Sequence, residues 1–178
     1  MTRSRVLAMV VEDKPGVMTR IADMFRRKLV NIDTITVGKT RVPGLSRIVI
    51  TLECDDNFAR YVVRLLRKTV DVLHVEELDP ANSILRELAL VKVEVTDTQE
   101  RLELLQLVNI FRGGIVDVSE KTITAQVVGA PSKVEAFIRL CRRFNISEIA
   151  RTGVVAMSRG PKTMLPESLA KKFMEEGP

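Results

Sequence analysis

Two kinds of hydrophobic spacing alternate along the chain, and their order constrains the fold more than any other feature. Runs rich in β-branched residues, typical of strands, flank segments in which apolar residues recur every three or four positions, typical of helices. One round of this order covers residues 4–78, and a second covers residues 87–159. Each round reads strand, helix, strand, strand, helix, strand. The chain therefore repeats one pattern twice with different residues.

The βαββαβ order is that of ferredoxin-like domains. We predict an α+β protein made of two tandem ferredoxin-like βαββαβ units. The 178 residues suffice for two small domains, each with its own core. The predicted strands are residues 4–12, 31–39, 45–54, 71–78, 87–95, 114–120, 122–129 and 146–159, and the predicted helices are residues 15–28, 57–69, 98–112 and 131–144.

The units are delimited by turn and linker signals. We predict the first domain over residues 1–79 and the second over residues 87–160. Asp79-Pro80 ends the last strand of the first unit and opens a linker over residues 80–86. Residues 161–178 read as a polar tail, in which a short helix would pair the apolar residues at positions 169 and 173.

Several function classes lack the residues that they need. The chain has one histidine, His74, in the middle of a predicted strand, and no nucleophile motif or metal-ligand cluster accompanies it. Cys54 and Cys141 fall in different units, so we expect free thiols in a reducing cytoplasm rather than a disulfide framework. No apolar run approaches the roughly 20 residues of a membrane span. We expect no catalytic residue, no bound metal, no membrane and a cytoplasmic location.

The net charge of +5 raises the question of nucleic acid. Ferredoxin-like domains that bind RNA stack bases on aromatic residues of their central strands. The corresponding segments RVLAMVV and LSRIVITL contain no aromatic residue, and neither do LALVKVEV and TITAQVV of the second unit. We therefore expect no nucleic-acid partner and attribute the charge to a solvated surface.

The segment EDKPGV joins the first predicted strand to the first predicted helix. Backbone N–H groups at a helix start lack partners and attract an anion, and Gly16 would let a carboxylate approach the backbone closely. Asp13 could pair with an ammonium group, and we expect Asn31 at the same end of the sheet. The three residues predict a receptor for a zwitterionic amino acid. An ordinary strand-to-helix turn and an ordinary asparagine cap are the alternative interpretation.

The longer motifs resemble one family, the small regulatory subunits of acetolactate synthase, also called acetohydroxyacid synthase. The resemblance covers about residues 3–160, and its first unit is similar to an ACT domain. The second unit carries the more specific motifs. The motifs are EDKPGVMTRIADMFRRKLVNIDTITV, LSRIVIT and KTVDVLHVEEL in the first unit, and RELALVKV, NIFRGGIVDV, SKVEAFI and EIARTGVVAMSRG in the second.

The resemblance implies a regulatory, non-catalytic subunit that activates a separate catalytic subunit and makes it sensitive to feedback inhibition, usually by valine, in branched-chain amino acid biosynthesis. Thiamine diphosphate, Mg and FAD are expected on the large catalytic subunit and no cofactor on this chain. The resemblance also implies a homodimer through the ACT domains, with valine or a related amino acid at its interface. The implied effector-binding residues are Asp13, Gly16, Val17, Asn31 and Ile32.

Two positions depart from the family's pattern. Asp13 stands where the family often has asparagine, and its charge would favour the ligand's ammonium and repel its carboxylate. Leu29 stands where many ACT domains have glycine, and we expect it to resist a positive φ and to alter the turn. A free-standing amino-acid sensor that controls another enzyme is the alternative function. The largely apolar helix over residues 98–112 is a candidate contact with a catalytic subunit, the alternative being burial in its own core.

Overall fold

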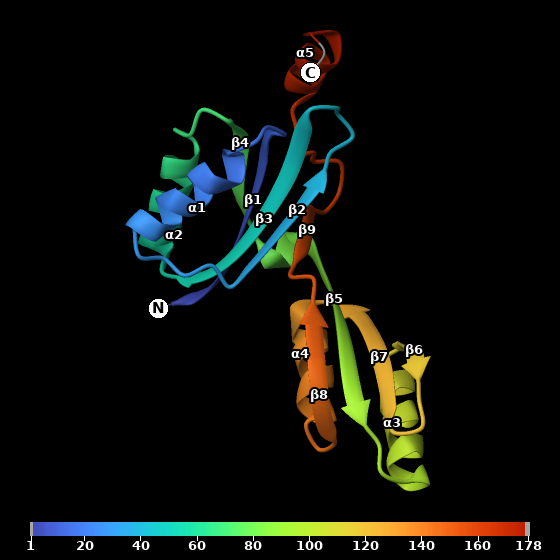
Figure 1. Cartoon of the computed structure of the whole chain (residues 1–178). Coiled ribbons are helices and arrows are strands. Elements are labelled where there is room, and N and C mark those ends of the chain that lie inside the picture. The colour runs from blue at the N-terminus through green and yellow to red at the C-terminus, as the bar shows by residue number, and fades with distance from the viewer. Residues whose placement is uncertain (1, 177–178) are drawn as a thin grey trace. The chain divides into compact units, whose positions relative to one another are not determined.

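The computed structural model describes residues 2–176 of the chain (Figure 1). Position 1 of the predicted first domain and positions 177–178 of the predicted tail lie outside the described residues. The predicted fold class is confirmed, because two βαββαβ units follow one another along the chain. The chain divides into two compact units, which are described in turn.

The first unit is a four-stranded antiparallel sheet with two helices on one face (Figure 1). The strand order is β2-β3-β1-β4, so β2 and β4 are the edges of this sheet. Alternate residues of β1 and β3 face the helices and form a core with the apolar faces of α1 and α2. The elements are β1 Arg3–Glu12, α1 Val17–Arg27, β2 Thr34–Lys39, β3 Leu45–Cys54, α2 Asp56–Leu66 and β4 Val72–Leu78.

Leu29 does not alter the turn after α1, contrary to expectation. It adopts a left-handed conformation, with φ of 53°. Its N–H donates to the Arg26 carbonyl at 3.1 Å, and the N–H of Val30 donates to the Phe25 carbonyl at 3.2 Å. This pair of bonds is the Schellman motif, and it supplies partners for two carbonyls at the helix end. The side chains of Val30 and Phe25 also pack in one core, which holds Leu29 in the turn that glycine would adopt more easily.

The second unit repeats this architecture. Its sheet has the strand order β6-β7-β5-β8, and its core lies between that sheet and helices α3 and α4. Helix α3 buries Leu104 and Val108 in this core and leaves Leu102 and Ile110 exposed, so only part of its apolar surface is used there. The elements are β5 Ser83–Glu94, α3 Thr98–Ile110, β6 Gly114–Val118, β7 Thr122–Gly129, α4 Pro131–Cys141 and β8 Asn145–Arg151.

The boundaries of the linker and of the last strand differ from the predicted ranges. The predicted linker is a short 3₁₀ turn, η1 Pro80–Asn82, and β5 begins directly after it at Ser83. The predicted last strand is interrupted near Gly153, which has a φ of 78°, and resumes as β9 Val155–Ser158. Residues from Val154 onward belong to the first unit, and Leu85–Gly153 form the second.

The returning segment covers the face of the first sheet that α1 and α2 leave open. That face is apolar, with buried Val6, Ala8, Val10 and Val49. Thr36 Oγ1 donates to the carbonyl of Val154 at 2.8 Å. The tail continues into helix α5 Glu167–Glu176, where a short helix was predicted. The side chains that it buries are Val154, Ala156, Met164, Leu165 and Ala170.

Candidate functional site

The turn between β1 and α1 presents an uncapped helix N-terminus. Gly16 is the N-cap residue, with φ of 88° and ψ of −11°, and no side chain accepts a hydrogen bond from the first turn. A Cβ at Gly16 would lie 3.8 Å from Arg20 Nη1, which is ordinary contact, so packing does not require glycine here. The left-handed backbone conformation is what favours it. The N–H of Val17 donates to the Lys14 carbonyl at 3.4 Å, and no side chain caps the rest of the first turn. The remaining N–H groups and the positive end of the helix dipole suit an anion.

Two cations flank this turn, and each is held by its own carboxylate. Arg20, one helical turn after Gly16, donates from Nε to Asp71 Oδ2 at 2.6 Å. Lys14 Nζ lies 2.6 Å from Glu12 Oε2, and this hydrogen bond and charge raise the pKa of Lys14. Sequence reasoning missed Arg20, although its spacing from Gly16 places it over the first turn of the helix. Asp71 pairs with the Arg20 guanidinium through Nε, and Arg20 Nη1 lies 3.8 Å from where a Cβ of Gly16 would stand, so this nitrogen is a candidate donor to a bound carboxylate.

Asp13 and Val17 occupy different environments at this turn. Asp13 is exposed, and its N–H donates to the Gly44 carbonyl at 2.8 Å, which ties the end of β1 to the β2–β3 hairpin. Val17 is 3 % exposed and packs in the core of the unit. Its side chain therefore cannot contact a ligand at the turn, and only its backbone belongs to the candidate site.

Asn31 and Ile32 lie at the other end of α1, which corrects the expectation that Asn31 sits beside Asp13. Strand β2 pairs antiparallel with β3, as β1 does, so β2 and β1 run parallel. The 11 residues of α1 span roughly 16 Å between the two groups. Asn31 is exposed, and Ile32 packs partly against the core. One chain therefore does not bring the predicted receptor together, and we call the two separated groups, at Asp13–Val17 and at Asn31–Ile32, the candidate half-sites.

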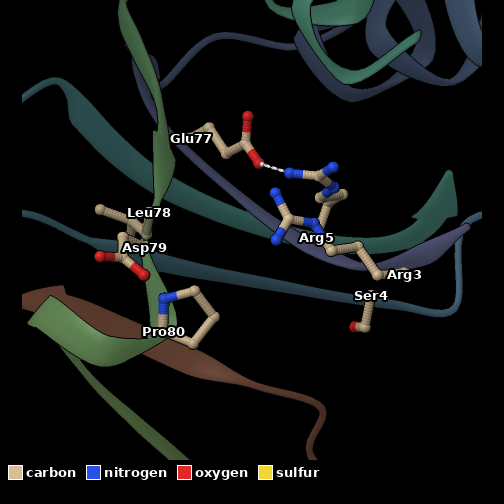
Figure 2. A pocket seen from close by; sticks show the side chains of 7 residues that line it. All are labelled: Arg3, Ser4, Arg5, Glu77, Leu78, Asp79 and Pro80. Carbon is tan, nitrogen blue, oxygen red and sulfur yellow. Dashed lines mark hydrogen bonds and ion pairs between the residues drawn. The ribbon is translucent and has the colours of Figure 1, made fainter. Parts of the chain in front are cut away.

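A hollow of about 260 Å³ lies at the start of β1 and the end of β4 (Figure 2). Arg5 and Glu77 point toward each other across it, and Arg5 Nη1 donates to Glu77 Oε1 at 2.7 Å. Arg5 also forms an ion pair with Asp56 at the start of α2. Arg5 is 6 % exposed. Arg5 Nε is buried without a hydrogen-bond partner in the described residues, but two carboxylates match the charge of the guanidinium. We therefore interpret this hollow as a structural ion-pair site rather than a ligand site.

The described residues lack two features that other functions would use. In residues 2–176 no helix is long and apolar enough to cross a membrane. The same part of the chain holds no group of three or more His, Cys, Asp or Glu side chains that could bind a metal ion.

Comparison with known proteins gives the same family for both units. A family model described as "AHAS small subunit-like ACT domain" matches residues 7–74, and one described as "Small subunit of acetolactate synthase" matches residues 86–160. A probable acetolactate synthase small subunit of Methanothermobacter thermautotrophicus is 45% identical over 161 residues, covering 90% of this chain and 96% of that protein. The acetolactate synthase small subunit of Mycolicibacterium smegmatis is 38% identical, covering 90% of this chain and 94% of its own.

A solved structure agrees with these sequence comparisons. The crystal structure of the acetolactate synthase small subunit from Thermotoga maritima is 44% identical to this chain and superposes with a TM-score of 0.82. The match covers 90% of this chain and 99% of that one. Similarity of this extent spans both units and the turn that carries the candidate site. The chain belongs to the family of acetolactate synthase small subunits.

Proposed function

We propose that this chain is the regulatory subunit of an acetolactate synthase and binds valine or a related branched-chain amino acid between two paired ACT domains. The chain would activate a separate thiamine-diphosphate-dependent catalytic subunit and make it sensitive to feedback inhibition. The observation that carries the effector site is the uncapped N-terminus of α1, with Gly16 in a left-handed conformation and Arg20 beside it.

The separation of the two half-sites supports a shared site. In a symmetric dimer each patch contacts the complementary patch of the other copy. If two α1 helices pack antiparallel about a twofold axis, Gly16 of one subunit comes close to Asn31 of the other. Two equivalent sites result, one at each end of the paired helices.

The edge of the first sheet supplies a surface for this pairing. β2 is an edge strand, and an unpaired edge is a template for association. Ile35 and Val37 on β2 share the helix-bearing face of the sheet with Ile48 and Ile50, with which they pair on β3. Ile35 is 38% and Val37 54% exposed, which is apolar surface that a second copy would cover.

The chemistry of an amino acid matches the two halves. The ligand's carboxylate would accept from the N–H groups at the start of α1, near Arg20. Its ammonium would donate to the Asp13 carboxylate or to the Asn31 amide oxygen of the second subunit. Its aliphatic side chain would contact the apolar edge near Ile32. Binding changes catalysis only if it favours one arrangement of the dimer, and a coupling of about 1–3 kcal/mol is typical.

Calorimetric titration of the full chain with valine, leucine and isoleucine tests the site. We expect saturable binding of valine by the wild type and at least a roughly tenfold loss of affinity, about 1.4 kcal/mol, in Gly16→Asp and in Asn31→Ala. Gly16→Asp places a negative charge where the carboxylate binds. Arg142→Ala, an exposed arginine of the second unit, is the matched control and should bind as the wild type does.

Mixing the two variants tests whether the site is shared. A dimer with Gly16→Asp in one subunit and Asn31→Ala in the other has one doubly altered site and one intact site. Mixed and re-equilibrated variants should therefore regain high-affinity binding that neither variant shows alone. Absence of regain in confirmed mixed dimers would place all the ligand contacts on one subunit and refute the shared site.

A separate measurement tests the regulatory role. Addition of the chain to a purified acetolactate synthase catalytic subunit from the same source should raise its activity, and valine should lower the raised activity. Association without any change in activity would refute the proposal, and so would valine inhibition that does not require this chain.

A further inference from the structure

A cavity of about 340 Å³ lies on the face of the first sheet opposite α1 and α2. Its floor includes Val10 of β1 and Arg47 of β3, which pair with each other across the sheet. One wall is the β2–β3 hairpin at Lys39, Thr40 and Arg41. The other wall is formed by residues 157–165 of the returning segment. The volume is in the range of roughly 300–1,000 Å³ that small-molecule sites occupy.

Four cationic side chains line this cavity, and only one of them has a carboxylate partner among the described residues. Lys162 Nζ donates to Glu76 Oε2 at 2.5 Å. No ion pair within residues 2–176 involves Lys39, Arg41 or Arg47. The cavity therefore holds an excess of positive charge, in contrast to the hollow at Arg5, whose charge is matched.

In the described part of the chain, Arg47 has both an unpaired charge and a buried N–H group without an acceptor. Its Nη2 donates to the Ala156 carbonyl at 2.6 Å, while its Nε is buried without a hydrogen-bond partner in the described structure. Burial lowers the pKa of the Arg47 guanidinium, and the nearby Glu76 carboxylate opposes this change. A buried donor without an acceptor destabilises the folded state, so an anion that reached Nε would be bound favourably.

The remaining lining consists of apolar side chains and of the hydroxyl residues Thr40, Ser158 and Thr163. Val10, Met157, Met164 and Leu165 contribute aliphatic and thioether groups to the cavity. Methionine side chains adjust to flat or aliphatic partners because they are unbranched and polarizable. The hydroxyl groups of Thr40 and Thr163 are engaged with main-chain carbonyls at 3.0 and 3.2 Å. The cavity thus combines cationic groups with apolar surface.

We propose that this cavity binds a phosphate monoester that carries an apolar or flat organic group. Three cations without carboxylate partners match a group of more than one negative charge, and a phosphate monoester carries about −1.5 to −2 at neutral pH. Arginine binds phosphate oxygens through its planar set of donors. The apolar walls would bury the organic group. This site is separate from the α1 turn, and its test does not depend on amino-acid binding.

Methyl NMR of the full chain with ¹³C-labelled methionine tests the proposal directly. The chain has seven methionines, of which Met157 and Met164 line the cavity, Met9 lies in the core on the other face of the sheet, and Met18 lies on α1. The probes are hexyl phosphate, AMP, inorganic phosphate and adenosine. We expect saturable shifts of the Met157 and Met164 methyl signals with hexyl phosphate or AMP, and much smaller changes at Met9 and Met18.

The two monoesters distinguish the kind of organic group. Stronger binding of hexyl phosphate would assign an aliphatic group, and stronger binding of AMP would assign a flat ring. Inorganic phosphate and adenosine each lack one half of the ligand and should bind at least roughly tenfold more weakly. Equal binding of inorganic phosphate, or equal binding of adenosine, would overturn the proposal that both halves of the ligand are recognised.

Two variants assign the binding to the cavity. The double variant Lys39→Ala/Arg41→Ala alters exposed hairpin residues, and it should lower monoester affinity at least about tenfold while the thermal unfolding midpoint stays near that of the wild type. Met157 is an exposed residue of the cavity wall. The carboxylate of Met157→Asp should repel the phosphate and weaken binding, whereas Met157→Leu should retain binding. The matched control is Arg142→Ala in the second unit. Unchanged affinity in the double variant would overturn the proposal, as would the absence of saturable monoester binding at millimolar concentration.

Discussion

The two units begin their first helices in opposite ways. In the second unit Asp97 caps α3, because its Oδ1 accepts from the Glu100 N–H at 2.8 Å, and Glu100 Oε2 in turn accepts from the Thr96 N–H at 2.8 Å. In the first unit Gly16 precedes α1, and no side chain caps it. The second unit thus satisfies its own helix end, whereas the first leaves donors for an external anion. The same fold provides a structural module and a candidate receptor through a few residues at one turn.

The rest of the scaffold agrees in detail. The pairing of the first and fourth strands is irregular between Val10 and Val11 in one unit and between Lys92 and Val93 in the other. The first helix of each unit ends in a left-handed residue that is not glycine, Leu29 or Arg112. These shared irregularities show that the difference at the helix N-terminus is local and is not a consequence of a different fold.

An ion pair joins the same two strands in each unit, with the charges exchanged. In the first unit Arg5 on β1 pairs with Glu77 on β4, and in the second Glu87 on β5 pairs with Arg151 on β8 through bonds of 2.7 and 2.9 Å. The two pairs also have the same register. Leu7, two residues after Arg5, is opposite Glu77, and Ala89, two residues after Glu87, is opposite Arg151. Glu87 is 1 % exposed, whereas the Glu77 side chain is 31% exposed.

Removal of the arginine of each ion pair, Arg151 or Arg5, should have the largest effect on the free energy of unfolding. The loss should differ between the two units. Arg151→Ala leaves the Glu87 carboxylate buried without its partner, and breaking such a pair costs about 3–5 kcal/mol. Arg5→Ala should cost less, because Glu77 can reach water. Urea unfolding of the full chain measures both. Equal losses would contradict this comparison, and Arg151→Lys, which keeps a positive charge beside Glu87 and Glu135, should lose less stability than Arg151→Ala.

The buried thiol of the second unit should make stability depend on alkaline pH. Burial raises the pKa of Cys141 to about 11 from its ordinary value of 9.0. The unfolded state therefore ionises first as the pH rises, so the contribution is complete below pH 9 and is lost by pH 11, by about 2–3 kcal/mol. Unfolding free energies measured across this range should fall, and Cys141→Ala should flatten the fall. An unchanged slope in the variant would contradict the assignment.

Removal of the N-cap of α3 tests whether an uncapped helix N-terminus is sufficient for amino-acid binding. Asp97→Ala should destabilise the chain by about 1 kcal/mol, because the N-cap bond is lost. It should not create an amino-acid site, because the proposed receptor also uses the glycine turn, the flanking cation and a second copy of the chain. Chemical unfolding and valine calorimetry of the same variant measure the two effects. Valine bound at a second site per chain would contradict this expectation.

Replacement of the left-handed residues by glycine should have the smallest effect, and it should be stabilising. Leu29 is 96% exposed, so Leu29→Gly loses little packing and relieves about 1–2 kcal/mol of backbone strain, less about 0.5–1 kcal/mol for the flexibility of glycine. Arg112→Gly should act similarly in the second unit. Thermal unfolding measures both. Loss of stability in Leu29→Gly would contradict this expectation.

Local sequence determined much of the molecule. Hydrophobic spacing predicted both βαββαβ units, and the glycine at position 16 predicted the turn. The spacing did not show that the Val17 side chain, an expected effector contact, packs in the core. The ends of α1 and α3 follow from short-range hydrogen bonds, which is why these elements could be predicted from neighbouring residues. The family was also identifiable from the longer motifs of both units, such as residues 12–37.

Only the tertiary structure decided how these pieces combine. Asn31 is separated from Gly16 because β2 runs parallel to β1, so the helix between them carries the chain to the opposite end of the sheet. The return of residues 154–176 to the first unit depends on an apolar outer sheet face that the two helices leave uncovered. Both outcomes arise from burial between segments far apart in the sequence, which the spacing of neighbouring residues does not encode.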